Sequence, residues 1–167
     1  TIGDRNIFMT FSHAGHDVRV ASDCTFVSSA MLGGHAWIDD HAIIGGGSGV
    51  HQFVRVGTGA MIGGVIICTL DLPPWFLMSG TNNVTSPNLV GMRRSGMPRE
   101  EIDRRRAIFK LTYREGLTAK QVVEALRSDG DAVALEYAEF IDQARKGACA
   151  GQQTRRRLER RGSRADA

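Results

Sequence analysis

The chain has 167 residues, of which 42% are hydrophobic and 23% are charged, and its formal net charge is +3. This balance is typical of globular proteins and excludes a chain that is disordered throughout. The longest apolar run, Val65–Cys68, is far shorter than the roughly 20 residues of a membrane-spanning helix, and no secretory signal opens the chain. Composition therefore predicts a cytoplasmic protein without a membrane span.

The cysteines and the arginines narrow the choice further. Cys24, Cys68 and Cys149 are widely spaced, which argues against a disulfide framework and against a zinc site made of thiolates. Six arginines fall within residues 155–164, whereas the rest of the chain is nearly neutral. This distribution indicates a basic tail on a neutral body.

A six-residue period runs through the first part of the chain. Glycine often follows the periodic position, and the fifth position of each hexad is often small. Short strands that meet at tight corners, each with one aliphatic and one small inward residue, are typical of a hexapeptide β-helix. Twelve periodic positions are all apolar: Ile2, Phe8, Ala14, Val20, Phe26, Leu32, Ile38, Ile44, Val50, Val56, Ile62 and Cys68.

The hexads predict a β-helix over residues 1–73. An ordinary β-sandwich would require strict alternation at period two, which the sequence lacks. Three hexads make one triangular coil in the known hexapeptide proteins, which wind left-handedly, so each coil climbs one strand spacing of about 4.8 Å. Twelve hexads then give four coils. Because the period is already in phase at Ile2, we expect that coils precede this residue.

Past Pro73 and Pro74 the hexad rule stops. Residues 74–97 read as an irregular connection rich in turn residues, and residues 98–146 as a helical domain. Pro98 suits the first helical position, Thr118 opens a capping box with Gln121, and Asp131 can cap a further helix. Residues 147–167 are predicted to be a basic, disordered tail. The tail lacks interleaved aromatic residues, so nucleic-acid binding ranks low.

The repeat of three hexads per coil determines where the histidines lie relative to one another. His16, Gly34 and Gln52 share one column, His35 lies one residue past it, and His51 lies one residue before it. The spacing therefore predicts that three imidazoles on successive coils lie within about 5 to 10 Å of one another. A column of this kind indicates a cleft that a second subunit covers, whereas His41 faces elsewhere.

Two kinds of site could use such a column. Histidines between subunits bind zinc in the carbonic anhydrases built on this fold, but the position of the third ligand falls at Val56. No metal and no cofactor are therefore expected. The other interpretation is acyl transfer, with an imidazole as general base on a hydroxyl.

Six segments resemble one family. The chain is similar to the acyl carrier protein-dependent UDP-N-acetylglucosamine O-acyltransferases that begin lipid A synthesis, over about two thirds of its length. The pairing of His-x-x-His-Asp with Val-His-Gln-Phe is fairly specific to them. The segments are His13–Asp17, Leu32–His35, Ala42–Gly46, Val50–Phe53, Asp71–Pro74 and Asn88–Arg94.

The resemblance implies roles for individual residues. His16 matches the general base, Gly34 the amide donor that stabilises the oxyanion, and Asp17 the residue beside the base. Gly64 falls where the family limits the length of the acyl groove, although simple corner geometry could also explain a glycine there. The positions that match contacts to the nucleotide sugar, its phosphates or the acyl chain are His13, His35, His51, Gln52, Asn88 and Arg94.

The implied function is transfer of a β-hydroxyacyl chain from acyl carrier protein to the 3-hydroxyl of UDP-N-acetylglucosamine by a homotrimer. Arg93, Arg94 and Arg104–Arg106 could meet the acidic carrier protein, although a solvated helix face explains the last three equally well. Two alternatives stay open. One is a non-catalytic trimeric scaffold, and the other is an N-acyltransferase that acts on an amino sugar nucleotide.

Overall fold

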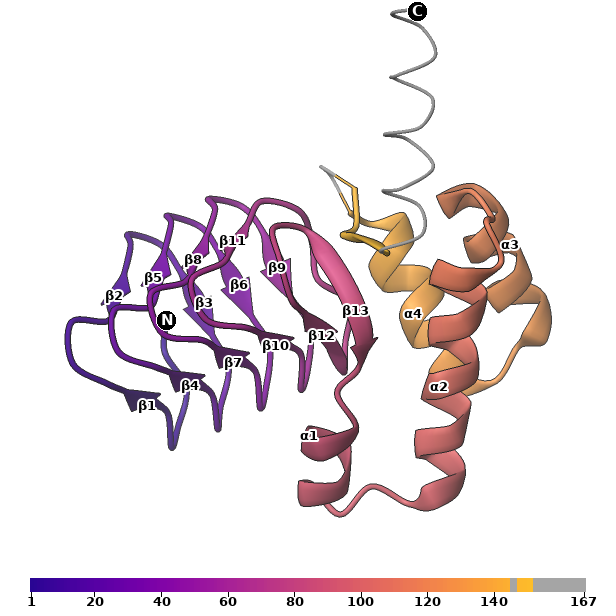
Figure 1. The fold of residues 1–167 in the computed structure, drawn as a ribbon, viewed down its shortest axis with the longest axis horizontal. Helices are drawn as coiled ribbons and strands as arrows, with labels where there is room; N and C mark the ends of the chain where they lie inside the picture. Colours follow the sequence, from indigo (N-terminus) through magenta and orange to yellow (C-terminus); the bar gives the residue numbers. More distant parts are fainter. Residues whose placement is uncertain (145–146, 152–167) are drawn as a thin grey trace, which may run out of the picture.

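The computed structural model describes residues 1–144 and 147–151. A β-helix fills one side of the molecule, and a group of helices packs at the end of its last coil (Figure 1). Within these residues, no helix has the length and apolar character needed to cross a membrane.

Eleven short strands build the coils. Each strand pairs in parallel with the equivalent strand of the next coil, so Thr25 lies beside Ile7 and Ile43 lies beside Thr25. This register confirms the predicted winding. The strands are β1 (Ile7–Phe8), β2 (His13–Ala14), β3 (Arg19–Val20), β4 (Thr25–Phe26), β5 (Met31–Leu32), β6 (Trp37–Ile38), β7 (Ile43–Ile44), β8 (Gly49–Val50), β9 (Arg55–Val56), β10 (Met61–Ile62) and β11 (Ile67–Cys68).

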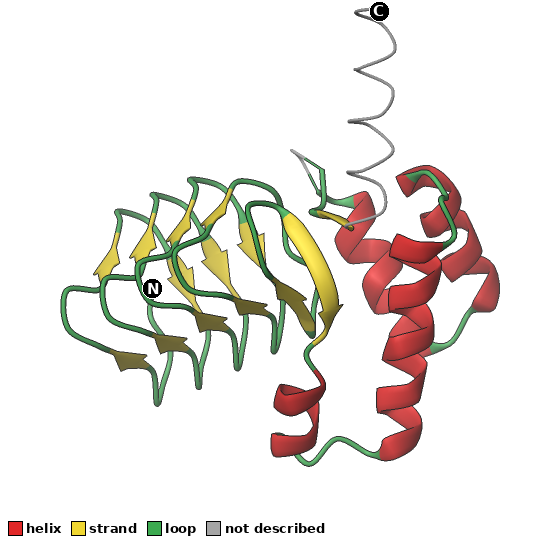
Figure 2. Cartoon of the chain, in the orientation of Figure 1, coloured by secondary structure: helices red, strands yellow, loops and turns green. Residues whose placement is uncertain are grey.

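The strands form three walls of a prism (Figure 2). The first wall begins β1-β4-β7-β10, the second wall is β2-β5-β8-β11, and the third wall is β3-β6-β9. Isolated parallel bridges, Ile2 to Val20 and Val56 to Leu72, extend the third wall at both ends. The four strands of the second wall mark the four predicted coils.

The core of the prism holds the periodic residues. From Val20 to Cys68, the second residue of every strand is buried, and the small residues at the fifth position, such as Ala30 and Ala42, are fully buried beside them. In the first coil Ile2 and Phe8 are 54% and 40% exposed. Burial of one aliphatic side chain per strand contributes roughly 1.5 to 3 kcal/mol, which makes the hexad pattern the main source of stability in the coils.

Each corner turns through a residue with left-handed backbone geometry. At the corner between the second and third walls these residues are Asp17, His35 and Phe53, with φ of 57°, 59° and 64°. Aspartate and histidine tolerate this conformation better than most other side chains. The His35 N–H donates to the His16 carbonyl at 3.0 Å, which ties two successive corners together.

Residues 74–97 are not irregular, which corrects the prediction for this segment. They contain β12 (Phe76–Met78), β13 (Asn83–Pro87) and α1 (Leu89–Arg94). β12 pairs in parallel with β10, with Met78 beside Ile62. This step is shorter than three full hexads, because the side that crosses from Cys68 to Leu72 is shorter than a hexad. Because this side is shorter than a hexad, the six-residue period did not predict the coil that contains β12.

The helices follow the sequence prediction closely. Thr118 and Gln121 form a reciprocal capping box, and the Asp131 carboxylate accepts from the amides of Val133 and Ala134. Each of the three longer helices begins within a residue of its predicted cap. They are α2 (Arg99–Arg114), α3 (Ala119–Asp129) and α4 (Ala132–Asp142).

Buried polar contacts fasten the helices to the last coil. The Tyr137 hydroxyl donates to the Pro74 carbonyl at 2.8 Å. Arg55 binds the buried Asp71 carboxylate at 2.9 Å and donates to the Phe140 carbonyl of α4 at 2.7 Å. These bonds make the β-helix and the helices one packed unit.

The start of the predicted tail is also structured. β14 (Ala150–Gly151) pairs in parallel with β13, so the prediction of disorder from residue 147 was wrong for residues 147–151. The arginine-rich part of the tail, at 155–164, lies outside the described residues.

Candidate active site

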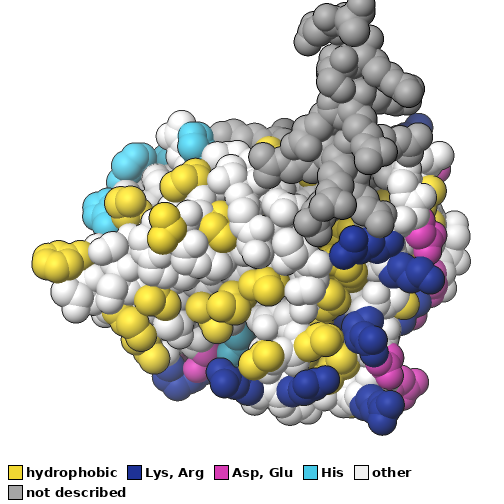
Figure 3. All heavy atoms as spheres, viewed as in Figure 1, with side chains coloured by type: hydrophobic (Ala, Val, Ile, Leu, Met, Phe, Trp, Pro, Cys, Tyr) yellow, Lys and Arg dark blue, Asp and Glu magenta, His cyan; other side chains and the backbone are white. Residues whose placement is uncertain are grey.

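The candidate residues gather mainly at one corner of the prism. We call the segments 15–18, 33–36 and 51–54, which join the second wall to the third, the histidine corner. The pairing of His13 with Met31, and of Met31 with Gly49, puts His16, Gly34 and Gln52 at the same turn of successive coils. Most of the histidine surface in Figure 3 is accordingly found along the upper left edge of the molecule, where Figure 1 places β2, β5 and β8. The register confirms that His16, Gly34 and Gln52 share one column, and the ring centroids of His16 and His35 lie 5.0 Å apart.

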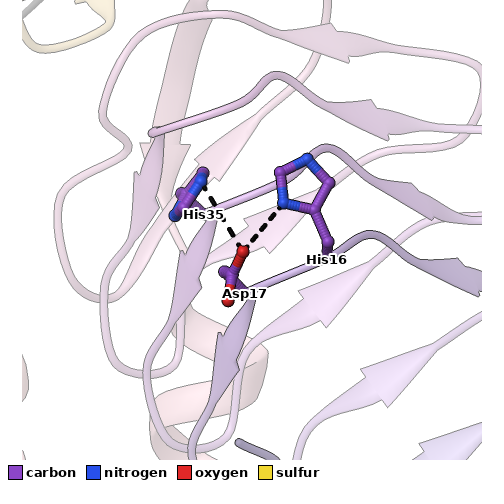
Figure 4. Close-up of side chains that lie close together, drawn as sticks. All are labelled: His16, Asp17 and His35. Carbon is purple, nitrogen blue, oxygen red and sulfur yellow. Dashed lines mark hydrogen bonds and ion pairs between the residues drawn. The ribbon is translucent and has the colours of Figure 1, made fainter.

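His16 and Asp17 form a hydrogen-bonded pair. The distance from His16 Nδ1 to Asp17 Oδ2 is 2.9 Å, and both side chains are largely exposed (Figure 4). The hydrogen bond to His16 lowers the pKa of the Asp17 carboxyl below its usual value, with a further contribution from His35. An ionised carboxylate only accepts, so the imidazole proton is on Nδ1 and the lone pair is on Nε2. His16 is thereby oriented to accept a proton at Nε2.

Gly34 lies directly against the imidazole of His16. A Cβ atom added at Gly34 would lie 2.6 Å from Nε2 and 2.7 Å from Cε1 of His16. The approach therefore requires glycine, although the backbone at Gly34 does not have left-handed geometry. Among the described residues, no hydrogen bond uses the Gly34 N–H. A free amide next to a basic nitrogen is the arrangement that an oxyanion site needs.

His35 completes a group of three polar side chains. Its Nε2 is 3.8 Å from Asp17 Oδ2, and its ring meets the His16 ring edge to face, with 5.0 Å between centroids (Figure 4). On the other side the His35 ring stacks on Phe53 with an interplanar angle of 5° and a centroid distance of 4.7 Å. Phe53 therefore fixes the orientation of the second imidazole.

His51, Gln52 and His13 flank this group. His51 and Gln52 belong to the histidine corner, one coil beyond Gly34, and His51 Nδ1 lies 3.2 Å from the Gln52 carbonyl. His13 begins β2 on the second wall, where its side chain is exposed. The structure thus gathers six of the ten candidate residues at the histidine corner, with His13 on the strand that leads into it.

The other candidates lie at different corners. Gly64 follows β10 at the corner between the first and second walls, where an added Cβ would meet only the Gly46 carbonyl, at 3.4 Å. Corner geometry does not require glycine there, because its φ is not positive.

Asn88 is buried at the corner between the third and first walls. It caps α1 and donates to the Gly59 carbonyl at 2.9 Å. Arg94 is exposed in the last turn of α1.

A groove beside the histidine corner was not predicted from the sequence. It encloses about 820 Å³ along the third wall and includes Asp17, His35 and Phe53 in its lining. Arg19, Trp37 and Arg55, which point outward from β3, β6 and β9, also line it, and the Arg19 guanidinium lies 5.2 Å from the Trp37 ring centroid. These residues are one coil apart, so the column arithmetic that located the histidines could have found them.

Three of the arginines assigned to a partner form ion pairs within the chain, and one of them is Arg106, which pairs with Asp103 at 2.9 Å. Arg104 bonds to Asp129 and Asp131, and Arg105 is buried, with its guanidinium paired to Glu101 and Glu136. Burial contradicts the suggestion that Arg105 meets the carrier protein, whereas for the partly exposed Arg104 and Arg106 it stays a prediction. The solvated-face alternative fails for Arg105 as well, because helix packing buries it.

Comparisons with known proteins agree on one family. Residues 71–149 match the family described as "Udp N-acetylglucosamine O-acyltransferase; Domain 2". A relative from Burkholderia orbicola, named acyl-[acyl-carrier-protein]–UDP-N-acetylglucosamine O-acyltransferase, is 39% identical over 156 residues, which cover 88% of this chain and 59% of the relative. The chain thus spans less than two thirds of the length of the relatives that it matches.

Solved structures give the same result. UDP-N-acetylglucosamine acyltransferase from Francisella novicida superposes with a TM-score of 0.87 at 31% identity, over 92% of this chain and 58% of that one. The enzyme from Campylobacter jejuni gives 0.83 at 30% identity, over 89% and 59%. The predicted fold class, a left-handed parallel β-helix followed by helices, is confirmed. By sequence and by fold, the chain is similar to the UDP-N-acetylglucosamine O-acyltransferases over most of its length.

Proposed function

We propose that the protein transfers a β-hydroxyacyl chain from acyl carrier protein to the 3-hydroxyl of UDP-N-acetylglucosamine, the first step of lipid A synthesis. The observation that carries this proposal is the His16 imidazole, which is hydrogen-bonded to Asp17 and packed against Gly34. Acyl transfer to a hydroxyl needs a base for the hydroxyl proton and a donor for the developing oxyanion. Both lie within one corner, and the chemistry needs no cofactor.

The reaction follows from the tautomer of His16. Nε2 takes the proton of the sugar hydroxyl as its oxygen attacks the thioester carbonyl, and the Gly34 N–H stabilises the resulting oxyanion. Collapse of the tetrahedral intermediate breaks the carbon–sulfur bond, and the leaving thiolate recovers the proton from Nε2. The Asp17 carboxylate stabilises the imidazolium between the two steps. An oxyanion donor of this kind contributes roughly 3 to 4 kcal/mol to the transition state.

The distribution of the candidates supports a homotrimer. Within one chain, the histidine corner and Gly64 occupy different corners of the prism. A single chain cannot bring these corners together, whereas a neighbouring copy can present its own corner to the histidine corner. We therefore propose that each active site is completed by a second copy, and sedimentation or light scattering of the purified protein measures this directly.

We propose that acyl carrier protein docks beside α1. Arg93 and Arg99 line a cavity of about 550 Å³ between α1 and α2, and Arg94 is exposed on the same short helix. An acidic partner would be attracted to this cluster, and the attraction would weaken with salt.

The three cysteines are free and buried thiols, which fits the cytoplasmic location that we propose for this reaction.

A direct assay tests the proposed function. The purified protein is mixed with a β-hydroxyacyl carrier protein and UDP-N-acetylglucosamine, and the 3-O-acyl product is followed by mass spectrometry. His16→Ala should abolish product formation, while His41→Ala, at a different corner, should not. Absence of product with the unmodified protein, or normal turnover by His16→Ala, would contradict the proposal. If an amide formed with the 3-amino analogue of the sugar nucleotide and no ester formed with UDP-N-acetylglucosamine, the protein would be an N-acyltransferase instead.

A further inference from the structure

His16, Asp17 and His35 have the geometry of a metal-binding site. One ligand atom from each of these residues lies within 4.8 Å of the other two. The two distances to Asp17 Oδ2 are 2.9 Å from His16 Nδ1 and 3.8 Å from His35 Nε2 (Figure 4). A tetrahedral zinc ion with ligands at about 2.0 to 2.2 Å separates its donors by about 3.3 Å. These two distances lie on either side of this value, and the donors of His16 and His35 lie within 4.8 Å of each other, so rotation of the exposed side chains would close the three donors around an ion.

The fold holds the three donors in place. Asp17 and His35 occupy the left-handed position of successive corners, and the His35 N–H donates to the His16 carbonyl at 3.0 Å. The His35 ring is also stacked on Phe53. The donors therefore come from two coils that are bonded to each other, and an ion would find them already assembled.

The donor set selects the class of ion. Two imidazole nitrogens and one carboxylate oxygen suit Zn²⁺, Co²⁺, Ni²⁺ and Cu²⁺, whereas Mg²⁺ and Ca²⁺ prefer oxygen ligands. The side chains of His16, Asp17 and His35 are 75%, 67% and 43% exposed, which leaves room for water at a fourth position. The sequence pattern disfavours zinc because the position of the third ligand falls at Val56. The Asp17 carboxylate supplies a different third ligand.

We propose that His16, Asp17 and His35 bind one Zn²⁺ ion per chain, and that this ion inhibits acyl transfer. Whichever nitrogen of His16 binds the metal, the other nitrogen of the neutral ring carries the proton, so no lone pair remains to act as a base. The inhibitory half of this statement rests on the proposed function. The binding half rests only on the geometry of the three side chains.

Binding is tested on the whole purified protein, freed of metal by a chelator. Calorimetry with ZnCl₂ and the visible absorption of added Co²⁺ should both report one ion per chain. His35→Asn should weaken binding by more than about tenfold. The matched control is His41→Asn, because His35 and His41 have φ of 59° and 60°, and each donates a backbone hydrogen bond of 3.0 Å to the preceding coil. The control should bind like the unmodified protein.

Several outcomes would overturn the site. Equal affinity in His35→Asn and the unmodified protein would remove His35 from the ligand set. An equal loss in His41→Asn would show non-specific binding to surface histidines. Preference for Mg²⁺ over Zn²⁺ would contradict the donor chemistry.

Inhibition is tested separately, so that failure of the function and failure of the site remain distinguishable. In the transfer assay, Zn²⁺ should stop turnover with the midpoint of the binding titration, and chelator should restore it, while Mg²⁺ should have no effect. A midpoint far from the binding constant would overturn the inhibitory mechanism. A protein that binds Zn²⁺ through His35 but makes no acyl product without metal would contradict the proposed function and leave the metal site standing.

Discussion

Gly34 and the imidazole of His16 pack so closely that a Cβ atom at Gly34 would lie 2.6 Å from Nε2. Gly34→Ala must therefore displace the ring, which is the far end of an exposed side chain and can move without unfolding the coil. Because a misplacement of about 1 Å costs about 100-fold in rate, kcat should fall by at least that factor. Steady-state kinetics and thermal melting measure the two effects.

The control for this substitution is Gly46→Ala. Gly46 occupies the equivalent place at another corner, and an added Cβ would meet no atom closer than 3.3 Å. If both variants lost activity equally, the contact with His16 would not be the cause.

Asp17→Asn should lower kcat about 10²- to 10⁴-fold with little change in the melting temperature. The carboxylate fixes the proton of His16 on Nδ1, and an amide can instead donate to Nδ1 and leave the proton on Nε2. The pair is exposed, so its loss has little effect on folding. The tautomer of His16 can be read from nitrogen NMR shifts in both proteins. An unchanged tautomer together with unchanged kcat would exclude Asp17 as the orienting group.

Gly64→Met should shift the acyl preference toward shorter chains. The space above Gly64 is open and its backbone conformation is ordinary, so the new side chain can project outward without strain. Competition among β-hydroxyacyl carrier proteins of different chain lengths measures the preference. If the preferred length does not change while a crystal structure of the variant shows the introduced side chain to be ordered, Gly64 is not at the end of the acyl groove.

Arg55→Ala should destabilise the protein by about 3 kcal/mol, because the Asp71 carboxylate would remain buried without its partner. Arg19→Ala is the matched control. Arg19 belongs to the same outward column, but it is exposed, and among the described residues the substitution removes its contact with Trp37, worth about 0.5 to 1 kcal/mol. Chemical denaturation gives both values. Equal losses would contradict the view that Arg55 fastens the helices to the coils.

Asp39→Asn should stabilise the protein at neutral pH. Burial raises the pKa of the Asp39 carboxyl to about 6, although Arg55 partly opposes this shift. When the pKa of an acid is higher in the folded state than in the unfolded state, protonation of the acid stabilises the fold. This stabilisation is complete below the unfolded pKa of about 4 and is lost as the pH rises through the folded pKa of about 6. The gain in the variant should be about 1 kcal/mol at pH 7.5, after allowance for solvent screening, and should vanish near pH 4. A pH-independent gain would assign the effect to packing.

The hexad period predicted the coils because it reflects a constraint that every residue shares. Each periodic side chain must face the axis of the prism, so the repeat of three hexads also located His16, Gly34 and His35 relative to one another. The same arithmetic could have separated Gly64 from them, since its place in the coil differs.

Other features depend on contacts that the six-residue period does not predict. The shortened step that brings Met78 beside Ile62 follows from the short crossing after Cys68. Arg105 looked like a surface arginine, and only the packing of α2 against α4 buries its guanidinium beside Tyr137. Asn88 looked available for a ligand, but its amide is engaged by Gly59 and Gly91. In each case the decisive neighbour is one that the hexad arithmetic does not locate.

The regular winding described above limits how this chain can tolerate changes in length. An insertion of one residue inside a strand between β3 and β8 would turn the side chains that follow in that strand to the opposite face, and a lost hexad would carry His35 to another wall. Only the gain or loss of a full turn keeps His16, Gly34 and Gln52 in line. Between His16 and Gln52, length variants should therefore come in steps of one turn, whereas the shorter side from Cys68 to Leu72 lies beyond the reacting groups.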